Sequence, residues 1–492
     1  MIIRAVNAVE AANNAAAVAV ESVVAGGFDR EVLRRLPLAE AVLSLWAFVM
    51  DPAFLDGVFE RHRGRSYEDV LTFPVFVELI ADALVQHRGS GRQAFERAKQ
   101  NDVLETSVEA MYGKLRRVPL SLSEGFLEEG TARLRELQSG RPAVAWPTSL
   151  SEFTPVIVDG KKLKQVAKRL LEARGQPGKL YGGKLLVAYV PTEDLVRAFH
   201  ADPDGEANDC KLMPGLIPRV RQVIAGLRLW ILDRQFCDLT QPRLLAQEGD
   251  YYIIRYHSKC RFERDISREI VTSQDAQGRT LIDEWGWLGS AKSKRRLYVR
   301  RARLERPGEE EIIVITNLLD ETKYPAADLL EAYLRRWGIE QVFQQITEVF
   351  HLQNLIGSTP EATIFQGAFC LMLYNLLQIT RQQIAAAQPT PCPTQSLSTE
   401  EIFRDVTRQL TAVTALIRPL ELAHLIPLSR SAVDLQPILT KLLSHPIPKL
   451  WRKTKNKRPR KKTLPKKQSG AHTSIAKLQA AATKTNTPKP SQ

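Results

Sequence analysis

Cysteine is scarce in this sequence, and its spacing shows no framework of disulfides or zinc ligands. The 492 residues include five cysteines, and no two of them form a C-x-x-C pair. A structural zinc site and a secreted, disulfide-stabilised fold are therefore disfavoured, and reduced cysteines in a cytosolic protein are expected. The five positions are Cys210, Cys237, Cys260, Cys370 and Cys392.

Long uninterrupted apolar runs are also missing. The alanine- and valine-rich N-terminus is broken by polar residues such as Glu10 and Glu21, so neither a secretory signal nor a membrane anchor is expected. The stretch Ile364–Ile379 contains Gln366 and Asn375, which favours a buried helix over a membrane span. The sequence therefore predicts a cytoplasmic protein with no membrane partner.

Acidic residues are absent from one part of the chain. Lys449–Gln492 contains fourteen Lys or Arg residues and no Asp or Glu. Subtracting these fourteen charges from the net charge of +14 leaves residues 1–448 formally neutral. This proline-interrupted tail is predicted to be disordered and to bind DNA nonspecifically, with RNA, other polyanions or solubility as alternative roles. Any nucleic-acid surface on the rest of the chain must then be a local patch.

The residues that are present divide the chain into regions of different periodicity. A length of 492 residues favours two to four domains. Apolar positions three and four residues apart predict helices, whereas short apolar runs bounded by turn residues predict strands. The predicted regions are a helical domain 1–138, a linker 139–152, an α/β domain 153–388 with a β-rich insertion 249–319, a linker 389–400, a helical segment 401–448 and a disordered basic tail 449–492.

Within the α/β domain, the local patterns predict individual elements. A strand reaches Asp159, and the sequence KKLKQVAKRLLEA (Lys161–Ala173) predicts a helix directly after it. Lys184–Val190 and Leu195–Ala201 are expected to form a hairpin across the turn PTED. A short helix, about residues 217–225, then precedes the strand that ends at Asp233.

Carboxylates stand at three places where rigid elements are predicted. The apolar runs PVIVDG and LRLWILD reach Asp159 and Asp233. In the helix-patterned stretch 331–350, Tyr333, Arg336 and Glu340 share one stripe, because spacings of three and four residues lie on one helix face. Three carboxylates on rigid elements are what a pair of Mg²⁺ ions needs for phosphoryl transfer.

Each of these features also has a simpler interpretation. Aspartates often end strands as turn or cap residues without any catalytic role. Arg336 and Glu340 could form a surface pair that contributes only about 0.3–0.5 kcal/mol. Spacing alone leaves both interpretations open.

The string YLRRWGIEQVFQQI resembles the Y-x2-R-x3-E-x6-K signature of bacterial insertion-sequence transposases, the DDE enzymes of the IS-four family. The resemblance extends to VDG at Asp159, to LDRQF at Asp233, and to ITNLLDETKYPAADLLEAYLRRW (Ile315–Trp337), so it covers about residues 150–380 in the family's order. One departure is clear: Thr347 stands where the signature has its lysine.

The resemblance implies a ribonuclease H-like α/β catalytic domain in which Asp159, Asp233 and Glu340 ligate two Mg²⁺ or Mn²⁺ ions. It further implies that Tyr333 and Arg336 contact DNA phosphate, which suits a guanidinium fork. Other expected DNA contacts are Lys161 and Lys162 after the first aspartate, Gln344 in place of the missing lysine, and Trp285 or Trp287, one of which would hold a flipped base. Both tryptophans could equally be packed into a small β core.

The function that follows from the resemblance is cleavage of a DNA strand at the transposon end and transfer of its 3′-OH to target DNA. The expected partners are double-stranded DNA, both transposon ends and target, and a second copy of the chain in a homodimeric DNA complex at the bacterial nucleoid. The N-terminal helices are expected, by analogy, to bind the ends. Two alternatives remain: a catalytically inactive DNA-binding protein derived from a transposase, and a ribonuclease H-like nuclease without a role in transposition.

Overall fold

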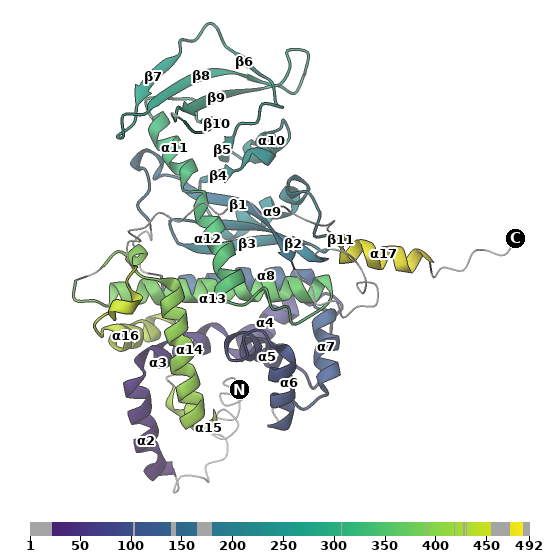
Figure 1. The fold of residues 1–492 in the computed structure, drawn as a ribbon, viewed down its shortest axis with the longest axis vertical. Coiled ribbons are helices and arrows are strands. Elements are labelled where there is room, and N and C mark those ends of the chain that lie inside the picture. Colours follow the sequence, from purple (N-terminus) through teal and green to yellow (C-terminus); the bar gives the residue numbers. More distant parts are fainter. Residues whose placement is uncertain are drawn as a thin grey trace, which may run out of the picture.

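A computed structural model describes most of the chain and shows a helical layer beneath a long twisted sheet (Figure 1). The described residues are 22–101, 104–138, 144–164, 180–306, 308–390, 392–417, 419–426, 429, 431–453 and 473–485. Predictions that concern the remaining residues, including most of the helix expected at Lys161–Ala173, lie outside this description.

The N-terminal region is helical, as its periodicity predicts. Asp51 begins one helix by accepting a hydrogen bond from the backbone N–H of Phe54, and Pro52 follows at the first helical position. Ser90 and Ser107 cap two later helices in the same way. The helices are α2 (Ser22–Arg35), α3 (Pro37–Val49), α4 (Pro52–His62), α5 (Phe73–Val85), α6 (Gly91–Gln100), α7 (Val108–Arg116) and α8 (Leu120–Arg135).

Five strands form the central part of the sheet, in the order β3-β2-β1-β4-β5. Strands β1, β4 and β5 run parallel to one another, whereas β2 is antiparallel to both β1 and β3. The hairpin expected across PTED is present, because β2 and β3 pair directly. Their bounds are β1 (Thr154–Lys164), β2 (Leu180–Val190), β3 (Leu195–Asp202), β4 (Arg228–Leu232) and β5 (Tyr251–Arg255).

The β-rich insertion continues this sheet instead of forming a separate one. Strand β10 pairs with β5, and β9, β8 and β6 follow it outward, with β7 on the other part of β8. The strands expected in 249–319 are therefore present, but they extend the central sheet, to which β5 itself belongs. The added strands are β6 (Phe262–Arg264), β7 (Val271–Gln274), β8 (Thr280–Leu288), β9 (Leu297–Leu304) and β10 (Ile312–Thr316).

Strand β1 is longer than the sequence predicts. It continues through Lys164, so the expected helix does not begin at Lys161. The reason is pairing: β2 is aligned with β1 from Ile157 to Lys164, and this tertiary partner overrides the local helical pattern. Lys161 and Lys162 consequently point to opposite faces of the sheet.

Helices cover the two faces of the central sheet. One face packs on α9 (Asp209–Val223), which is longer than the helix expected at 217–225, and α10 (Gln241–Ala246) follows β4. The other face packs on α11 (Ala326–Leu334), α12 (Trp337–Gln344) and α13 (Pro360–Ala386). Residues of β1 alternate between the two cores, with Val158 on the α9 side and Ile157 on the α13 side.

The 27-residue helix α13 crosses the centre of the molecule (Figure 1). It is long and apolar enough to span a membrane, but the apolar window that passes this test is entirely buried inside the protein. Side chains of α3, α5 and α8 share one hydrophobic core with α13 and with the sheet. The helical region and the α/β region are thus joined by a common core, although the sequence predicts a linker between them.

The C-terminal part is helical and then returns to the sheet. Its helices are α14 (Thr399–Leu416), α15 (Pro419–Leu425), α16 (Ala432–Leu443) and α17 (Ile475–Thr485), with the short strand β11 (Thr473–Ser474) before the last one. The prediction of disorder from residue 449 onward is wrong for these parts: Trp451 is buried and donates to Asp405, β11 pairs with β2, and Lys477 contacts Glu206. The intervening residues 454–472 lie outside the described part.

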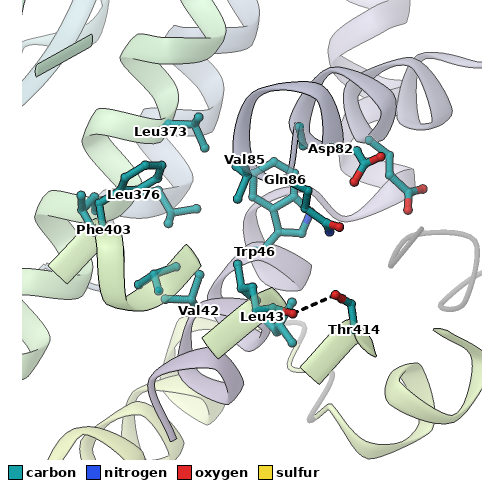
Figure 2. Close-up of a pocket in the computed structure, with 15 residues that line it drawn as sticks. Val42, Leu43, Trp46, Asp82, Val85, Gln86, Leu373, Leu376, Phe403 and Thr414 are labelled. Atoms are coloured by element: carbon teal, nitrogen blue, oxygen red, sulfur yellow. Dashed lines mark hydrogen bonds between the residues drawn. The ribbon is translucent and has the colours of Figure 1, made fainter. Parts of the chain in front are cut away.

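An apolar pocket lies in the helical layer (Figure 2). Its wall is built by α3, α5, α13 and α14, with Trp46, Leu376 and Phe403 among its lining side chains and Asp82 at its rim. None of the residues that line it is one of the predicted site residues.

Candidate active site

The two aspartates lie side by side because their strands are neighbours. In the parallel pairing of β1 with β4, Val158 is aligned with Leu232, and Asp159 and Asp233 come directly after these partners. Asp159 stands within β1, opposite Val187 of β2, whereas Asp233 follows the last residue of β4. The sheet therefore fixes both carboxylates at one place, as the apolar runs predict.

The residues of the stripe, Tyr333, Arg336 and Glu340, come from two consecutive helices and the break between them, not from one helix. The sequence predicts a continuous helix over 331–350, but α11 ends at Leu334 and α12 begins at Trp337. Arg336 lies in the break with helical backbone angles, and a π-helical segment, Gln345–Val349, follows α12. The stripe survives the break because Arg336 and Glu340 remain four residues apart on a common face.

Arg336 connects the strand side of the site to the helix side. Its Nη1 lies 3.5 Å from Oδ2 of Asp159, and its Nη2 donates to Oε1 of Glu340 at 3.1 Å. The hydroxyl of Tyr333 lies 3.5 Å from Oδ1 of Asp233. The five predicted residues are therefore gathered at one site, with the guanidinium between two of the three carboxylates.

The surroundings of the site shift the pKa values of its ionisable residues. Burial raises the pKa of Asp159 to about 6, against hydrogen bonding from the backbone N–H of Gly160 and the charge of Arg336, which lower it. Burial and the charge of Asp233 raise the pKa of Tyr333, so its phenol stays protonated. Burial acts to lower the pKa of Arg336, yet the surrounding Tyr333 and carboxylates raise it. A desolvated carboxylate of this kind gains from any cation placed beside it.

The donor chemistry fits a hard divalent cation, although the present arrangement does not form a complete cage. Carboxylate oxygens are the ligands that Mg²⁺ and Mn²⁺ prefer. Among the residues that the structure describes, no three or more His, Cys, Asp or Glu side chains are gathered closely enough to hold a metal ion. Arg336 supplies the positive charge between Asp159 and Glu340 instead.

The sequence does not predict a buried ion pair between Lys184 and Asp209 on the α9 side of the sheet. Asp209, at the first position of α9, pairs with Lys184 of β2, and both side chains are buried. A Cβ atom on Gly160 would overlap the carboxylate of Asp209. The glycine after Asp159 is therefore required by close packing, and Asp209 also contributes to the raised pKa of Asp159. Lys184 lies inside an apolar strand pattern, where a single sequence gives no sign of its partner.

The two predicted lysines have different surroundings. Lys161 donates to the hydroxyl of Thr347 at 2.8 Å, across the sheet–helix interface. Lys162 lies over the ring of Tyr181, 5.1 Å from its centroid. Gln344, expected to replace the missing lysine, donates to Glu348 on the exposed side of its helix. The structure thus brings Lys161, and not Gln344, to position 347.

The two tryptophans of the insertion are not equivalent. Trp285 is buried, its indole N–H donates to the carbonyl of Leu319, and Arg268 stacks over its ring at 3.8 Å. Trp287 is partly exposed and contacts Arg296, whose guanidinium lies 4.2 Å from the ring centroid. Base stacking by either residue stays a prediction, and only Trp287 offers an accessible ring in this conformation.

One exposed aromatic residue next to Arg336, Trp337, is not among the residues that the signature specifies. Trp337, the residue after Arg336, is 62% exposed at the start of α12. It lies between Arg336 and Glu340 in the sequence, but its side chain faces solvent. A large apolar side chain exposed beside a charged site is a candidate for ligand contact.

Comparison with known proteins is consistent with this geometry. A family model described as "Transposase DDE domain" matches residues 151–376, the part of the chain that contains all five site residues. The chain is also similar to "Putative transposase y4zB" from Sinorhizobium fredii (strain NBRC 101917 / NGR234), with 26% identity over 204 residues. That match covers 41% of this chain and 54% of the relative, so the chain spans about half of the relative's length. Residues 151–376 of this chain are therefore similar to a DDE transposase domain.

Proposed function

We propose that this protein is a transposase that cleaves DNA at the ends of an insertion sequence and transfers the freed 3′-OH to target DNA. The observation that carries the proposal is the meeting of Asp159, Asp233 and Glu340 at one site, from two parallel strands and a helix. Three carboxylates with a buried phenol and a guanidinium suit a phosphodiester substrate better than a small neutral one.

The sheet order supports a ribonuclease H-like domain. Three antiparallel strands, β3-β2-β1, followed by the parallel strands β4 and β5, place the first two carboxylates on adjacent strands. Strands β6 to β9 enter the chain between Asp233 and Glu340, which is where the resemblance places the insertion. The support for the proposed fold thus comes from the order and direction of the strands.

The proposed cofactors are two Mg²⁺ or Mn²⁺ ions held by Asp159, Asp233 and Glu340. When bound, such ions activate the attacking oxygen and stabilise the leaving oxygen of a phosphodiester. Arg336 would leave its position between Asp159 and Glu340 and bind a DNA phosphate through its planar fork. Tyr333, buried and protonated, would donate from its hydroxyl to the same backbone.

The expected partners follow from this substrate. Double-stranded DNA would lie across the carboxylates, with Lys161, Lys162 and Trp287 as neighbouring contacts. We propose that two copies of the chain bind a pair of ends together at the bacterial nucleoid. Light scattering of the protein with and without end DNA tests the dimer, and a complex containing one copy of the chain contradicts it.

A catalytically inactive DNA-binding protein is the second candidate. It is favoured by the ion pairs that Arg336 forms with Asp159 and Glu340, two of the three carboxylates. Thr347, which stands where the signature has a lysine, also favours this candidate. The two candidates differ in whether DNA is cut, which one experiment decides.

The test is cleavage of a duplex that carries the ends of the DNA element encoding this chain, with Mg²⁺ or Mn²⁺ added. We expect nicking and strand transfer by the natural sequence, and none after Glu340→Gln, after Asp159→Asn or with excess EDTA. Glu331→Gln is the matched control, since Glu331 is an exposed partner of Arg335 on the same helical stretch. Tight binding without cleavage by the natural sequence supports the inactive protein, and undiminished cleavage by Glu340→Gln contradicts the site assignment.

A further inference from the structure

Lys161 reaches from the sheet to the helix that carries Glu340. Its ammonium donates to Oγ1 of Thr347 at 2.8 Å and lies 3.3 Å from the carbonyl oxygen of Phe343. Thr347 in turn donates its hydroxyl to the same carbonyl at 2.6 Å, and the ammonium lies 5.4 Å from the centroid of the Phe343 ring. A hydroxyl, a carbonyl and a ring face thus hold one cation in place.

The held cation lies on the same face of β1 as the catalytic aspartate. Asp159 and Lys161 are two residues apart on one strand, so both side chains point to the α12 face at a spacing of about 7 Å. Glu340 and Thr347 are seven residues apart, two turns along α12 and the π-helical segment. The pair Lys161–Thr347 therefore lies next to the pair Asp159–Glu340 along the same interface between β1 and the helical segment.

A pocket opens beside this cation. It is lined by Gly160, Lys161, Lys162, Thr347 and Gln353, together with three leucines. The charged residues of this lining are Lys161 and Lys162, and the lining, as far as the structure describes it, contains no carboxylate. A pocket with this lining favours an anionic group over a cation or an apolar ligand.

The π-helical segment explains how a threonine fits here. Thr347 lies within Gln345–Val349, where the helix widens and the backbone N–H of Phe350 donates to the carbonyl of Gln345. Single π turns inside α-helices often occur at functional sites. A shorter side chain at position 347 leaves room for the ammonium of Lys161 to enter from the strand.

We propose that the pocket beside Lys161 binds a DNA phosphate next to the one that is cut, and that Lys161 provides its cation from β1. The helix position where the transposase signature has a lysine is then used by Thr347 to position Lys161. In this chain the positive charge at this position would come from the strand and not from the helix. This inference rests on the proposed function, because it assumes that DNA lies across Asp159 and Glu340.

Exchanging the two side chains tests the proposal directly. Binding of end DNA is measured in a Glu340→Gln background, so that cleavage does not interfere, at several salt concentrations. We expect Lys161→Thr to weaken binding about 10- to 100-fold, as for the loss of one charged hydrogen bond, and to lower the salt slope by about 1. The double variant Lys161→Thr/Thr347→Lys should recover most of the affinity and the slope, because it returns the ammonium to the same interface.

Two further variants separate a contact with DNA from an effect on folding. Lys211→Thr is the matched control: Lys211 is exposed on α9, which covers the opposite face of the sheet, and its replacement should change affinity less than threefold, about 0.6 kcal/mol. Thr347→Val removes the hydroxyl with little change in shape and should weaken binding, whereas Thr347→Ser should retain it.

The outcomes are distinct from those that test the proposed function. Wild-type affinity and salt slope for Lys161→Thr, or a double variant no better than the single one, overturn the role of Lys161. Neither result depends on cleavage. Failure of the natural sequence to cut DNA overturns the proposed function, and it leaves the measured salt slopes interpretable as binding.

Discussion

A buried ionic network joins the β2–β3 hairpin to helix α13, and its removal offers a quantitative test of the structure. Asp194, in the turn of the hairpin, accepts hydrogen bonds from the hydroxyls of Tyr189 and Tyr374 at 2.7 and 2.6 Å. Its other oxygen accepts from Arg381 of α13 at 2.6 Å, and Arg381 also donates to Thr399. Burial, and then the charge of Asp194, raise the pKa values of both tyrosines, so they act as donors.

Asp194→Asn is the perturbation, because asparagine keeps the shape and tolerates the left-handed backbone at this position, where φ is +56°. The amide oxygen can still accept from the tyrosines, but Arg381 keeps a charge that is 4% exposed and has lost its counterion. Breaking a buried pair from one side costs about 3–5 kcal/mol. That is a large share of the roughly 5–15 kcal/mol that stabilises a typical protein.

Urea unfolding followed by circular dichroism measures the effect as a fall in the free energy of unfolding. The double variant Asp194→Asn/Arg381→Gln should lose less than the sum of its two single variants, because no charge is then left unpaired. Glu400→Gln is the control: Glu400 and Arg404 are 60% and 48% exposed, so this change should cost less than about 1 kcal/mol. A loss below about 1 kcal/mol for Asp194→Asn would refute the network as a stabilising link.

Three further predictions concern Gly160, the basic residues of 454–472 and the two tryptophans of the insertion. Gly160→Ala should destabilise the protein by about 1–3 kcal/mol and abolish Mg²⁺-dependent cleavage, because the new Cβ overlaps Asp209; normal urea unfolding and activity would contradict this. Replacing the eight Lys and Arg residues in 454–472 by Gln should flatten the salt dependence of nonspecific DNA binding. The replacements leave the contacts of Trp451 and α17 intact. An unchanged salt slope in filter binding would exclude this segment as a DNA contact. Trp287→Ala should reduce the fluorescence change of 2-aminopurine placed near the transposon end, whereas Trp285→Phe should leave it; equal effects would contradict the different exposure of the two rings.

The sequence predicts the elements that carry Asp159, Asp233 and Glu340, because each of these elements depends on a local pattern. Asp159 and Asp233 follow apolar runs, and such runs form neighbouring buried strands in an α/β sheet. The stripe from Tyr333 to Glu340 depends only on helical spacing, which survives the break between α11 and α12. Local information therefore suffices where a residue's position is set by the element that carries it.

Features that depend on distant partners are missed. The local pattern at Lys161 favours a helix, and only pairing with β2 makes it a strand, so its contact with Thr347, 186 positions away, cannot be read from either segment. The pairing of β11 with β2 has the same origin, since a sheet edge can fix residues that composition predicts to be disordered. The shared core of the helical region and the sheet is likewise a property of packing rather than of any linker composition.

The position of α13 has a consequence for how the protein can be divided. Phe369 of α13 packs on Phe126 of α8 at 5.8 Å, and Asn375 donates to Thr131 of the same helix. A fragment that begins at Phe153 would carry α13 without α8 and expose an apolar strip to water, which favours aggregation. The helical region and the sheet should therefore melt in a single cooperative transition. If the N-terminal helices bind DNA as proposed, they should do so as a rigid part of the protein and not as a separately tethered domain.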